Sequence, residues 1–188
     1  LRLDRYWQLP DDDSAPADVT AEEITSLLED AVRIRLRAET PVGTLLSGGL
    51  DSSGVTCLAA RLVAGSITAF STVTCPPTDE AHGIDLVVAA HHNVHPIRDE
   101  PAPTCLDDEL PSCLWHQEEP FADGSMLAHF RLMRLARQSG TRVLLTGQAA
   151  DELFAGYPGH LAIHAGGLIR HGHWRSALSF LSAASRLP

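Results

Sequence analysis

A loop of small and polar residues directly follows an aliphatic run in the stretch LLSGGLDSSG, from Leu45 to Gly54. Gly48 and Gly49 can adopt positive φ and bring backbone N–H groups close to an anion. The serine hydroxyls add hydrogen-bond donors, and a helix beginning near Ser52 would point its positive end at the same place. This set of groups favours a binding site for a polyphosphate.

A carboxylate lies within the same loop, at Asp51. It is a poor partner for phosphate but a good ligand for the Mg²⁺ that accompanies a polyphosphate. An ordinary strand-to-helix turn would also explain Gly49 as a geometric residue and Asp51 as a helix cap. That alternative leaves three serines and a second glycine without a role, so we favour the phosphate-binding interpretation.

A second loop of related composition reads TGQAADE, from Thr146 to Glu152, and follows the predicted strand RVLL. It offers a hydroxyl and a glycine, and then an acidic pair where a helix would start. Acidic residues at that position also simply stabilise a helix N-terminus. If both loops lie at adjacent strand ends, Asp151 supplies a second carboxylate for the same Mg²⁺.

Strand-like and helix-like patterns alternate along the chain, which predicts an α/β fold of Rossmann-like type, with a parallel sheet of about four or five strands between two layers of helices. Ligands of such sheets bind beyond the carboxyl ends of the strands, which would place Asp51 opposite Asp151 across a cleft. The expected strands are Val42–Leu46, Ile67–Val73, Val94–Ile97 and Arg142–Leu145. The expected helices are one capped by Thr20, Ser52–Val63, Glu80–His92, Leu106–His116 interrupted at Pro111, one capped by Ser125 and ended by Gly140, and further segments from Leu161 onward.

The composition restricts the class of protein. A chain of 188 residues suits one domain. The formal charge of -10 and the lack of a basic cluster argue against nucleic-acid binding. No apolar run approaches the roughly 20 residues of a membrane helix, and no signal segment opens the sequence. All 14 basic residues are Arg, which excludes a Walker-type P-loop lysine and a pyridoxal phosphate Schiff base within this chain.

The cysteines and histidines do not indicate a metal centre. The four cysteines are Cys57, Cys75, Cys105 and Cys113, and no two of them form a CxxC pair, so we expect reduced thiols in a cytoplasmic protein. Two histidine pairs have the i, i+4 spacing that could hold a metal, His91 with His95 and His160 with His164, but neither carries an HExxH acid.

The segment SGGLDSS resembles the phosphate-loop signature of the N-type ATP pyrophosphatases, the PP-loop superfamily with its adenine nucleotide alpha hydrolase-like fold. Either loop alone would also fit NAD or GMP synthetases, argininosuccinate synthetase or tRNA-thiolating enzymes. LLSGGLDSS together with TGQAADELFAGY resembles the asparagine synthetase family in particular, and RYWQLP is similar to the segment that joins the two domains of that family. The resemblance implies an ATP-dependent ligase that adenylates a carboxylate such as aspartate, releases pyrophosphate and forms an amide with ammonia.

Carried over to this chain, the resemblance implies an ATP site with Mg²⁺. Its nucleotide-binding residues would be Leu46, Ser47, Gly48, Gly49, Leu50, Asp51, Ser52, Ser53, Thr72, Thr146 and Gly147. Asp51 and Asp151 would hold the metal and, with Gln148, act in catalysis. The stretch EEPFADGS, with Glu118, Glu119 and Asp123, falls where the family shapes its acceptor pocket, although a charged loop and a helix cap explain these acids equally well.

Two positions depart from the family pattern, since Gln148 stands where an acidic residue is usual and Ala149 where a glycine is usual. Because of Gln148, a second hypothesis remains: the chain belongs to a related enzyme in which the nucleophile is an amine of the substrate itself, as in β-lactam synthetases and lasso-peptide cyclases. A nucleotide-binding module without catalysis is a third hypothesis.

The resemblance also predicts the domain organisation. Residues 1–18 would be an interdomain linker, residues 19–158 the PP-loop core, and residues 159–188 the start of a helical C-terminal part. We expect the full-length protein to carry an N-terminal glutaminase domain. A homodimer is one possible assembly of the full-length protein. Because the 188 residues contain no Lys, we expect them not to synthesise asparagine alone.

Overall fold

The computed structural model describes residues 2–8, 19–73, 81–101 and 105–185. In this part of the chain, four parallel strands form one sheet with the order β3-β2-β1-β4. The strands are β1 Val42–Leu45, β2 Ile67–Thr72, β3 Val94–Asp99 and β4 Val143–Leu145. Gly43 of the central strand β1 pairs with Thr68 on one side and with Leu144 on the other. The parallel sheet confirms the predicted α/β fold.

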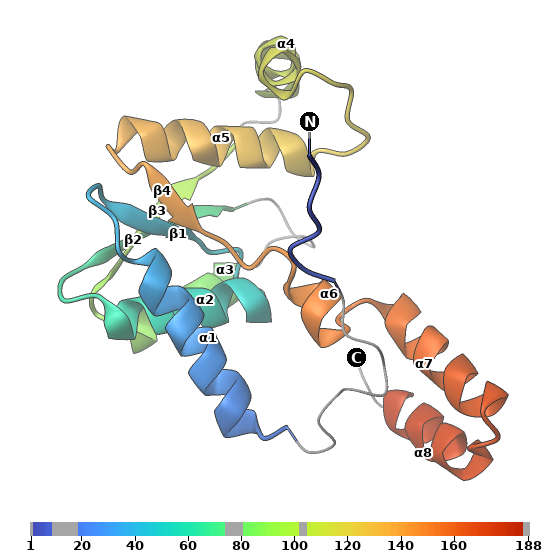
Figure 1. The fold of residues 1–188 in the computed structure, drawn as a ribbon. Coiled ribbons are helices and arrows are strands. Elements are labelled where there is room, and N and C mark those ends of the chain that lie inside the picture. The colour runs from blue at the N-terminus through green and yellow to red at the C-terminus, as the bar shows by residue number, and fades with distance from the viewer. Residues whose placement is uncertain (1, 9–18, 74–80, 102–104, 186–188) are drawn as a thin grey trace.

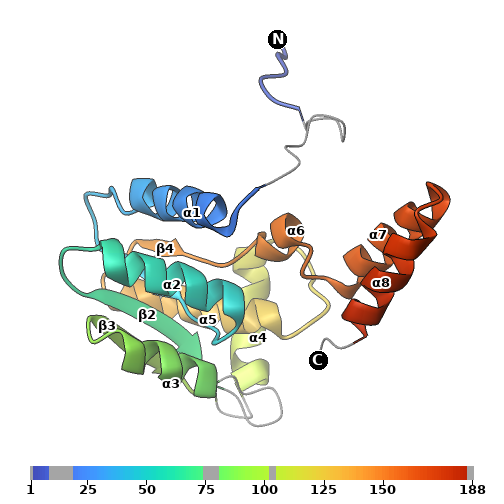
Figure 2. The same cartoon turned by 90° about the horizontal axis from the view of Figure 1, so that it is seen from below.

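Helices cover both faces of this sheet, so that the molecule has three layers (Figures 1 and 2). One face carries α1 Ala21–Arg35, α2 Leu50–Leu62 and α3 Ala81–Ala90. The other face carries α5 Ser125–Gln138, and α4 Cys105–Gln117 packs against α5. The strands β1 and β2 between these layers are therefore mostly buried, which explains their apolar residues, whereas the edge strand β3 is buried only at its first residue, Val94.

Two apolar clusters hold the layers together. The larger one lies between the sheet and the first three helices and includes Leu46, Ala59, Ile67, Ile84 and Val94. The smaller one joins the sheet to α5 through Phe70, Leu132 and Ala136. Phe70 is fully buried, and burial of a side chain of this kind stabilises a fold by about 1.5–3 kcal/mol.

Several helix ends differ from the sequence prediction. The predicted capping box of Thr20 is confirmed, because Glu23 N donates to Thr20 Oγ1 at 3.2 Å and Thr20 N donates to Glu23 Oε2 at 2.8 Å. Ser125, in contrast, is not the cap of α5; it is the first residue of the helix, and its N–H donates to Asp123 Oδ1 at 2.8 Å. The break predicted at Pro111 was wrong as well, since α4 continues through this residue. Proline removes one backbone donor from the helix, which nevertheless runs on to Gln117 and packs on α5.

The start of α2 was also predicted too late. The helix begins at Leu50 and not at Ser52, with Gly49 as its N-cap. Asp51 therefore lies in the first turn of α2. A carboxylate there is stabilised by the positive end of the helix dipole.

The chain after the sheet is helical. It consists of α6 Ala150–Phe154, α7 Pro158–Arg170 and α8 Trp174–Ala184. The last two pack on each other and extend away from the sheet (Figure 1), which agrees with the helical prediction from Leu161 onward, although α7 begins three residues earlier. Large apolar side chains stay exposed on this hairpin, among them Ile163, Trp174 and Leu178.

Some predictions fall on parts of the chain that the structure does not describe. Of the predicted linker, residues 2–8 contain no helix or strand, and residues 9–18 lie outside the described part.

Cys57 and Cys113 are free, and burial raises the pKa of both thiols. Cys75 and the side chain of Cys105 lie outside the described residues. No helix between residues 19 and 185, where described, has the length and apolar character that crossing a membrane requires.

Candidate functional site

The loop between β1 and α2 is closed by its own serine side chains. Ser52 Oγ accepts a hydrogen bond from Ser47 N at 3.1 Å, lies 2.9 Å from Ser47 Oγ and donates to Gly49 O at 3.2 Å. Ser47 Oγ also accepts from Gly49 N at 3.3 Å. The loop is therefore held in a defined shape directly at the N-terminus of α2.

Close backbone contact with α3 also positions this loop. Gly48 has φ 94°, a left-handed conformation that a residue with a Cβ rarely adopts. A Cβ added at Gly83 of α3 would lie 2.3 Å from Gly48 O, so α3 can approach the loop only because Gly83 has no side chain. Two glycines far apart in sequence thus fix where the loop lies.

The second loop contacts the first at the same edge of the sheet. A Cβ added at Gly147 would lie 2.7 Å from Ser52 N and 2.9 Å from the carbonyl carbon of Asp51. Because β1 and β4 are parallel neighbours, their carboxyl ends bring these segments together. The structure thereby confirms that the two loops share one edge.

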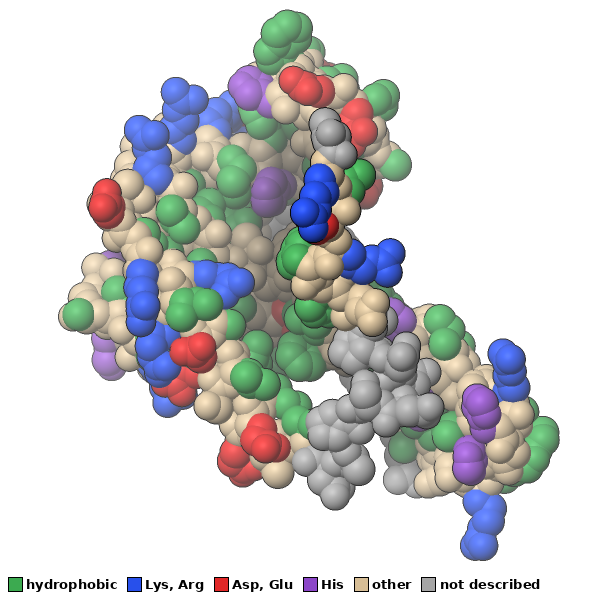
Figure 3. Space-filling model, viewed as in Figure 1, with side chains coloured by type: hydrophobic (Ala, Val, Ile, Leu, Met, Phe, Trp, Pro, Cys, Tyr) green, Lys and Arg blue, Asp and Glu red, His purple; other side chains and the backbone are tan. Residues whose placement is uncertain are grey.

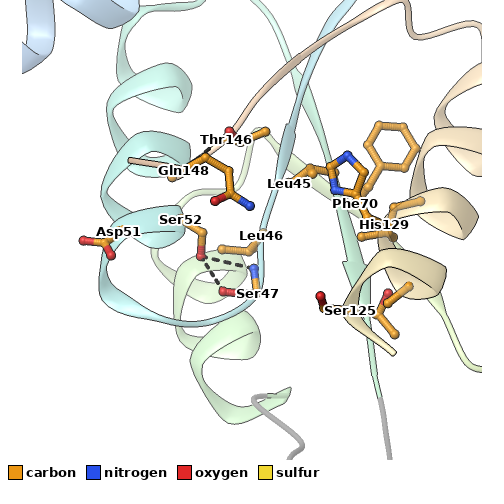
Figure 4. Close-up of a pocket in the computed structure, with 14 residues that line it drawn as sticks. Leu45, Leu46, Ser47, Asp51, Ser52, Phe70, Ser125, His129, Thr146 and Gln148 are labelled. Atoms are coloured by element: carbon orange, nitrogen blue, oxygen red, sulfur yellow. Dashed lines mark hydrogen bonds between the residues drawn. The ribbon is translucent and has the colours of Figure 1, made fainter. Parts of the chain in front are cut away.

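A cavity of about 360 Å³ lies beside the two loops, within the size range of small-molecule sites. Figure 3 shows that this face of the molecule is hollowed beneath α4 and α5, and Figure 4 shows the lining side chains. Eight of the residues predicted from sequence line the cavity: Leu46, Ser47, Asp51, Ser52, Thr72, Thr146, Gly147 and Gln148. The structure therefore brings the first loop, the end of β2 and the second loop together at one cavity.

The opposite wall of the cavity comes from residues that the sequence analysis missed. They are Leu45 and Phe70 from the strands, and Ser125, Ala128, His129 and Leu132 from α5. Ser125 and His129 are four residues apart, so they lie on one face of the helix. Sequence periodicity can assign them to a face, but it cannot tell that this face borders a cavity.

Thr72 has an unusual environment at the carboxyl end of β2. Its Oγ1 atom is buried and has no hydrogen-bond partner among the described residues, and the same holds for Ser71 Oγ. A buried polar atom without a partner costs about 1–3 kcal/mol. Because Thr72 lines the cavity, a bound ligand could supply the partner.

The remaining predicted residues do not line the cavity. Gly48, Gly49, Leu50 and Ser53 belong to the first loop and the start of α2, and Leu50 is 88% exposed. Asp151 lies in α6, where its Oδ1 is 1.9 Å from the position that a Cβ on Gly156 would take. Within the described residues, no group of three or more His, Cys, Asp and Glu side chains is arranged to hold a metal ion. A magnesium site on Asp51 and Asp151 stays a prediction.

The proposed acceptor segment lies beside a second cavity, of about 510 Å³. Glu118 and Glu119 line it together with Leu114, Trp115 and Pro120. Asp123 does not line it and instead accepts hydrogen bonds at the start of α5, which lower the pKa of this carboxyl. The acceptor role of the three acids therefore stays a prediction.

An ion-pair network fixes α5, which carries the missed wall. Arg131 binds both carboxylate oxygens of Asp99, at the end of β3, at 2.7 Å each, and Glu109 of α4 at 2.6 Å. Arg134 also binds Glu109. The hydrogen bonds to Asp99 raise the pKa of Arg131, so the guanidinium stays charged. Burial alone would raise the pKa of Glu109, but the bonds from Arg134 and Arg131 lower it.

Comparison with known proteins finds relatives that are named asparagine synthetases. The family model described as asparagine synthase matches residues 23–186. A protein of Methanocaldococcus jannaschii named as a glutamine-hydrolysing asparagine synthetase is 35% identical over 168 residues, covering 86% of this chain and 31% of the relative. Glutamine-hydrolysing asparagine synthetase 1 of Bacillus subtilis is 31% identical over 140 residues, covering 74% of this chain and 22% of the relative. The chain thus spans less than a third of either relative.

A solved structure supports the fold. The NH3-dependent NAD synthetase of Campylobacter jejuni superposes with a TM-score of 0.51 and 19% sequence identity, over 74% of this chain and 62% of that one. At this identity the likeness concerns the arrangement of strands and helices alone.

Proposed function

The chain belongs to the asparagine synthase family, and we propose that it binds ATP in the cavity at the sheet edge and uses it to activate a carboxylate for amide formation with ammonia. The main support for this proposal is that the two loops meet at this edge of the sheet, where eight residues predicted from sequence line one cavity. Residues 1–18, 19–158 and 159–188 would serve as linker, catalytic core and start of a helical C-terminal part.

The first loop would bind the phosphates. The hydroxyls of Ser47 and Ser52 point into the space beside the N-terminus of α2, a helix of 13 residues. Free N–H groups and the positive helix end both favour an anion at this position. A pyrophosphate leaving group would be stabilised by the same donors.

A magnesium ion fits the oxygen donors of this site. Mg²⁺ is usually bound by one or two carboxylates together with substrate phosphates and water. Asp51 is one of the residues that line the cavity and would be the first carboxylate, although its side chain would have to turn toward the hydroxyls of Ser47 and Ser52, from which it points away in Figure 4. We assign Asp151, on the second loop, as the other. The ion would neutralise charge on the phosphates during the reaction.

The proposed reaction needs positioning more than a nucleophilic side chain. A carboxylate oxygen of the acceptor attacks the α-phosphorus of ATP, and pyrophosphate leaves. Ammonia then attacks the carbonyl carbon of the acyl-adenylate and releases AMP and a proton. Preorganised donors that face the developing charge can supply most of such a rate enhancement.

Isotope exchange tests this function. In the presence of Mg²⁺ and its carboxylate substrate, the full-length protein should exchange labelled pyrophosphate into ATP. Aspartate is the first acceptor to try. Binding of ATP without exchange for any carboxylate tested would contradict the enzymatic function and favour a non-catalytic nucleotide-binding module.

A second candidate function follows from Gln148, which lines the cavity at a position where the family usually has an acidic residue. In this alternative the adenylation step is unchanged, but an amine of the substrate itself attacks and closes a ring. Aspartate and ammonia, supplied together, separate the two functions. Release of asparagine excludes the ring-closing alternative, whereas exchange without asparagine favours it.

The ammonia of the first candidate function could come from glutamine. Both relatives described above are named glutamine-hydrolysing. We propose that a glutaminase domain in the full-length protein supplies ammonia to the site. Glutamine should then replace ammonium in the asparagine assay of the full-length protein.

A further inference from the structure

A cavity of about 310 Å³ lies between the carboxyl end of α5 and the start of β4, at the opposite end of this strand from the second loop. Its polar lining residues are Arg137, Thr141 and Arg142. Its apolar lining residues are Met133, Ala136 and Leu144. The volume lies at the lower end of the range of small-molecule sites, so the cavity can hold a small ligand.

The two arginines of this cavity have unpaired charges. Within the described residues, neither Arg137 nor Arg142 forms an ion pair or a side-chain hydrogen bond. Arg131 and Arg134, earlier in α5, both bind carboxylates. No acidic residue lines the cavity among those that the structure describes. Two positive charges therefore share one cavity without a protein counter-charge, and Figure 3 shows arginine side chains gathered over this end of α5.

We propose that Arg137 and Arg142 bind a small anion with carboxylate or phosphate groups. A guanidinium presents a planar fork of N–H donors, which matches the paired oxygens of these groups and forms two parallel hydrogen bonds. Two such forks in one cavity favour an anion with more than one charged oxygen. The chain has a formal net charge of -10, so attraction of anions by the molecule as a whole does not explain such a site.

Thr141 would provide a further donor. Its side chain lies mostly buried, and its Oγ1 accepts a hydrogen bond from Ser139 Oγ at 3.2 Å. The hydroxyl proton of Thr141 is therefore available to an anion in the cavity. Because Thr141 lies between the two arginines in sequence and in the cavity lining, one ligand can contact all three residues.

The carboxyl end of α5 does not compete for the two arginines. A helix end of this kind carries a partial negative charge on its last carbonyl groups, which would disfavour an anion. Here these carbonyls already accept hydrogen bonds from the backbone that follows: Ser139 N donates to Leu135 O, Thr141 N to Ala136 O and Gly140 N to Arg137 O, at 2.9–3.1 Å. The guanidinium groups are thus free for a ligand.

This site is independent of the proposed function, because none of its lining residues lines the nucleotide cavity. The strand β4 has three residues between Arg142 and Thr146, and a strand rises about 3.3 Å per residue. The two cavities therefore lie at opposite ends of one short strand.

Titration calorimetry with two probes, succinate and inorganic phosphate, tests the site and identifies the anionic group that it prefers. The full-length protein should bind at least one probe with a Kd of about 0.1 mM, as expected for a few exposed charge-assisted contacts. Tighter binding of succinate would identify a carboxylate ligand, and tighter binding of phosphate would identify a phosphate ligand.

Variants locate the bound probe. Arg137→Gln and Arg142→Gln should each bind the preferred probe about tenfold more weakly, the scale of one lost hydrogen bond to a charged group. Arg142→Lys should lose less, because it keeps the charge but not the fork. Arg61→Gln is the matched control, since it removes an exposed arginine in the last turn of α2 that does not line the cavity. The affinity for ATP should stay within about twofold of wild type in every variant, because the two cavities share no residue.

The outcomes are distinct. Wild-type affinity for both probes in Arg137→Gln and Arg142→Gln would overturn the site, as would a wild-type protein that binds neither probe below about 10 mM. An equal loss in Arg61→Gln would mean that charge in general attracts the anion, and a parallel loss of ATP affinity would mean that the arginines serve the nucleotide cavity. Either result would overturn the inference. Probe binding in a protein that does not bind ATP would contradict the proposed function alone.

Discussion

The two loops at the sheet edge differ in how firmly the structure holds them. In the first loop, Ser47, Gly49 and Ser52 are joined by hydrogen bonds, and Gly48 lies against α3. In the second, Gln148 N donates to Thr146 Oγ1 at 3.4 Å and Ala150 N donates to Gly147 O at 3.3 Å, and both bonds are long. Its next residue, Ala149, has φ 70°, which is unfavourable for a side chain with a Cβ.

From this difference we expect the two loops to serve different steps of the proposed reaction. The first loop is preorganised, so a phosphate bound there as proposed would cost little conformational entropy. The second loop carries the two residues, Gln148 and Ala149, at which this chain departs from the family pattern. We therefore expect changes in the first loop to weaken nucleotide binding and catalysis directly. Changes in the second loop should affect the acceptor step and stability.

The largest effect should come from the carboxylates, one on each loop. Asp51→Asn should reduce pyrophosphate exchange by about 100-fold or more, the usual scale for the loss of a group that stabilises charge in a transition state. If Asp151 is the second magnesium ligand, Asp151→Asn should match it.

Glu152→Gln is the matched control, because it removes one negative charge from α6 at a residue that does not line the cavity and accepts a hydrogen bond from Tyr157. Exchange near the wild-type rate in Asp51→Asn would mean that this residue only stabilises the start of α2. A loss confined to Asp51→Asn would leave Asp151 without a metal role.

Gly147→Ala should disrupt the contact between the loops. The new Cβ would come within 3 Å of backbone atoms of Ser52 and Asp51, neither of which can move independently of α2. Overpacking of this kind costs about 1–3 kcal/mol in the free energy of unfolding. Urea denaturation measures this cost, with Gly54→Ala as control, since a Cβ at Gly54 meets no atom within 4 Å. Equal stability of both variants would show that the loops do not contact as described.

Ser52→Ala should weaken the first loop alone. The substitution leaves Ser47 N without its acceptor and removes the hydroxyl contact at 2.9 Å. We expect a loss of about 1 kcal/mol in the free energy of unfolding, together with weaker ATP binding. Ser176→Ala, on an exposed position of α8, is the control. A Ser52→Ala variant as stable as this control would argue against a preorganised loop.

Ala149→Gly should act in the opposite direction and stabilise the protein. Glycine adopts positive φ without steric cost, and this gain exceeds the added entropy of the unfolded chain. We expect the free energy of unfolding to rise by about 0.5–1 kcal/mol. Ala183→Gly within α8 should instead lower it by about 1 kcal/mol. Thermal melting compares the two, and a destabilised Ala149→Gly variant would contradict the left-handed conformation at this residue.

The sequence predicted the loops because their chemistry is local. Serine and glycine directly after an apolar run indicate a loop that can bind an anion, and parallel strands bring successive loops to one edge. The wall formed by Ser125 and His129 could not be predicted in this way. Its position depends on how α5 packs on the sheet, and that packing rests on Arg131 reaching Asp99, 32 residues earlier in the chain.

The boundaries of helices show the same limit. The start of α2 at Leu50 depends on the conformation of the glycine pair, which residue types leave open. The helix α4 runs through Pro111 although local propensity alone predicts a break there. In both cases residue types alone do not determine where the helix begins or continues.

A crystal structure with a non-hydrolysable ATP analogue and Mn²⁺ tests the central claim most directly. We expect triphosphate density beside Ser47 and Ser52, with anomalous signal from the metal at Asp51. The neighbouring groove between α1 and α6, lined by Leu28, Leu153 and Phe154, offers an alternative position on the far side of the second loop. Nucleotide density in that groove, or triphosphate bound away from the serine loop, would contradict the account.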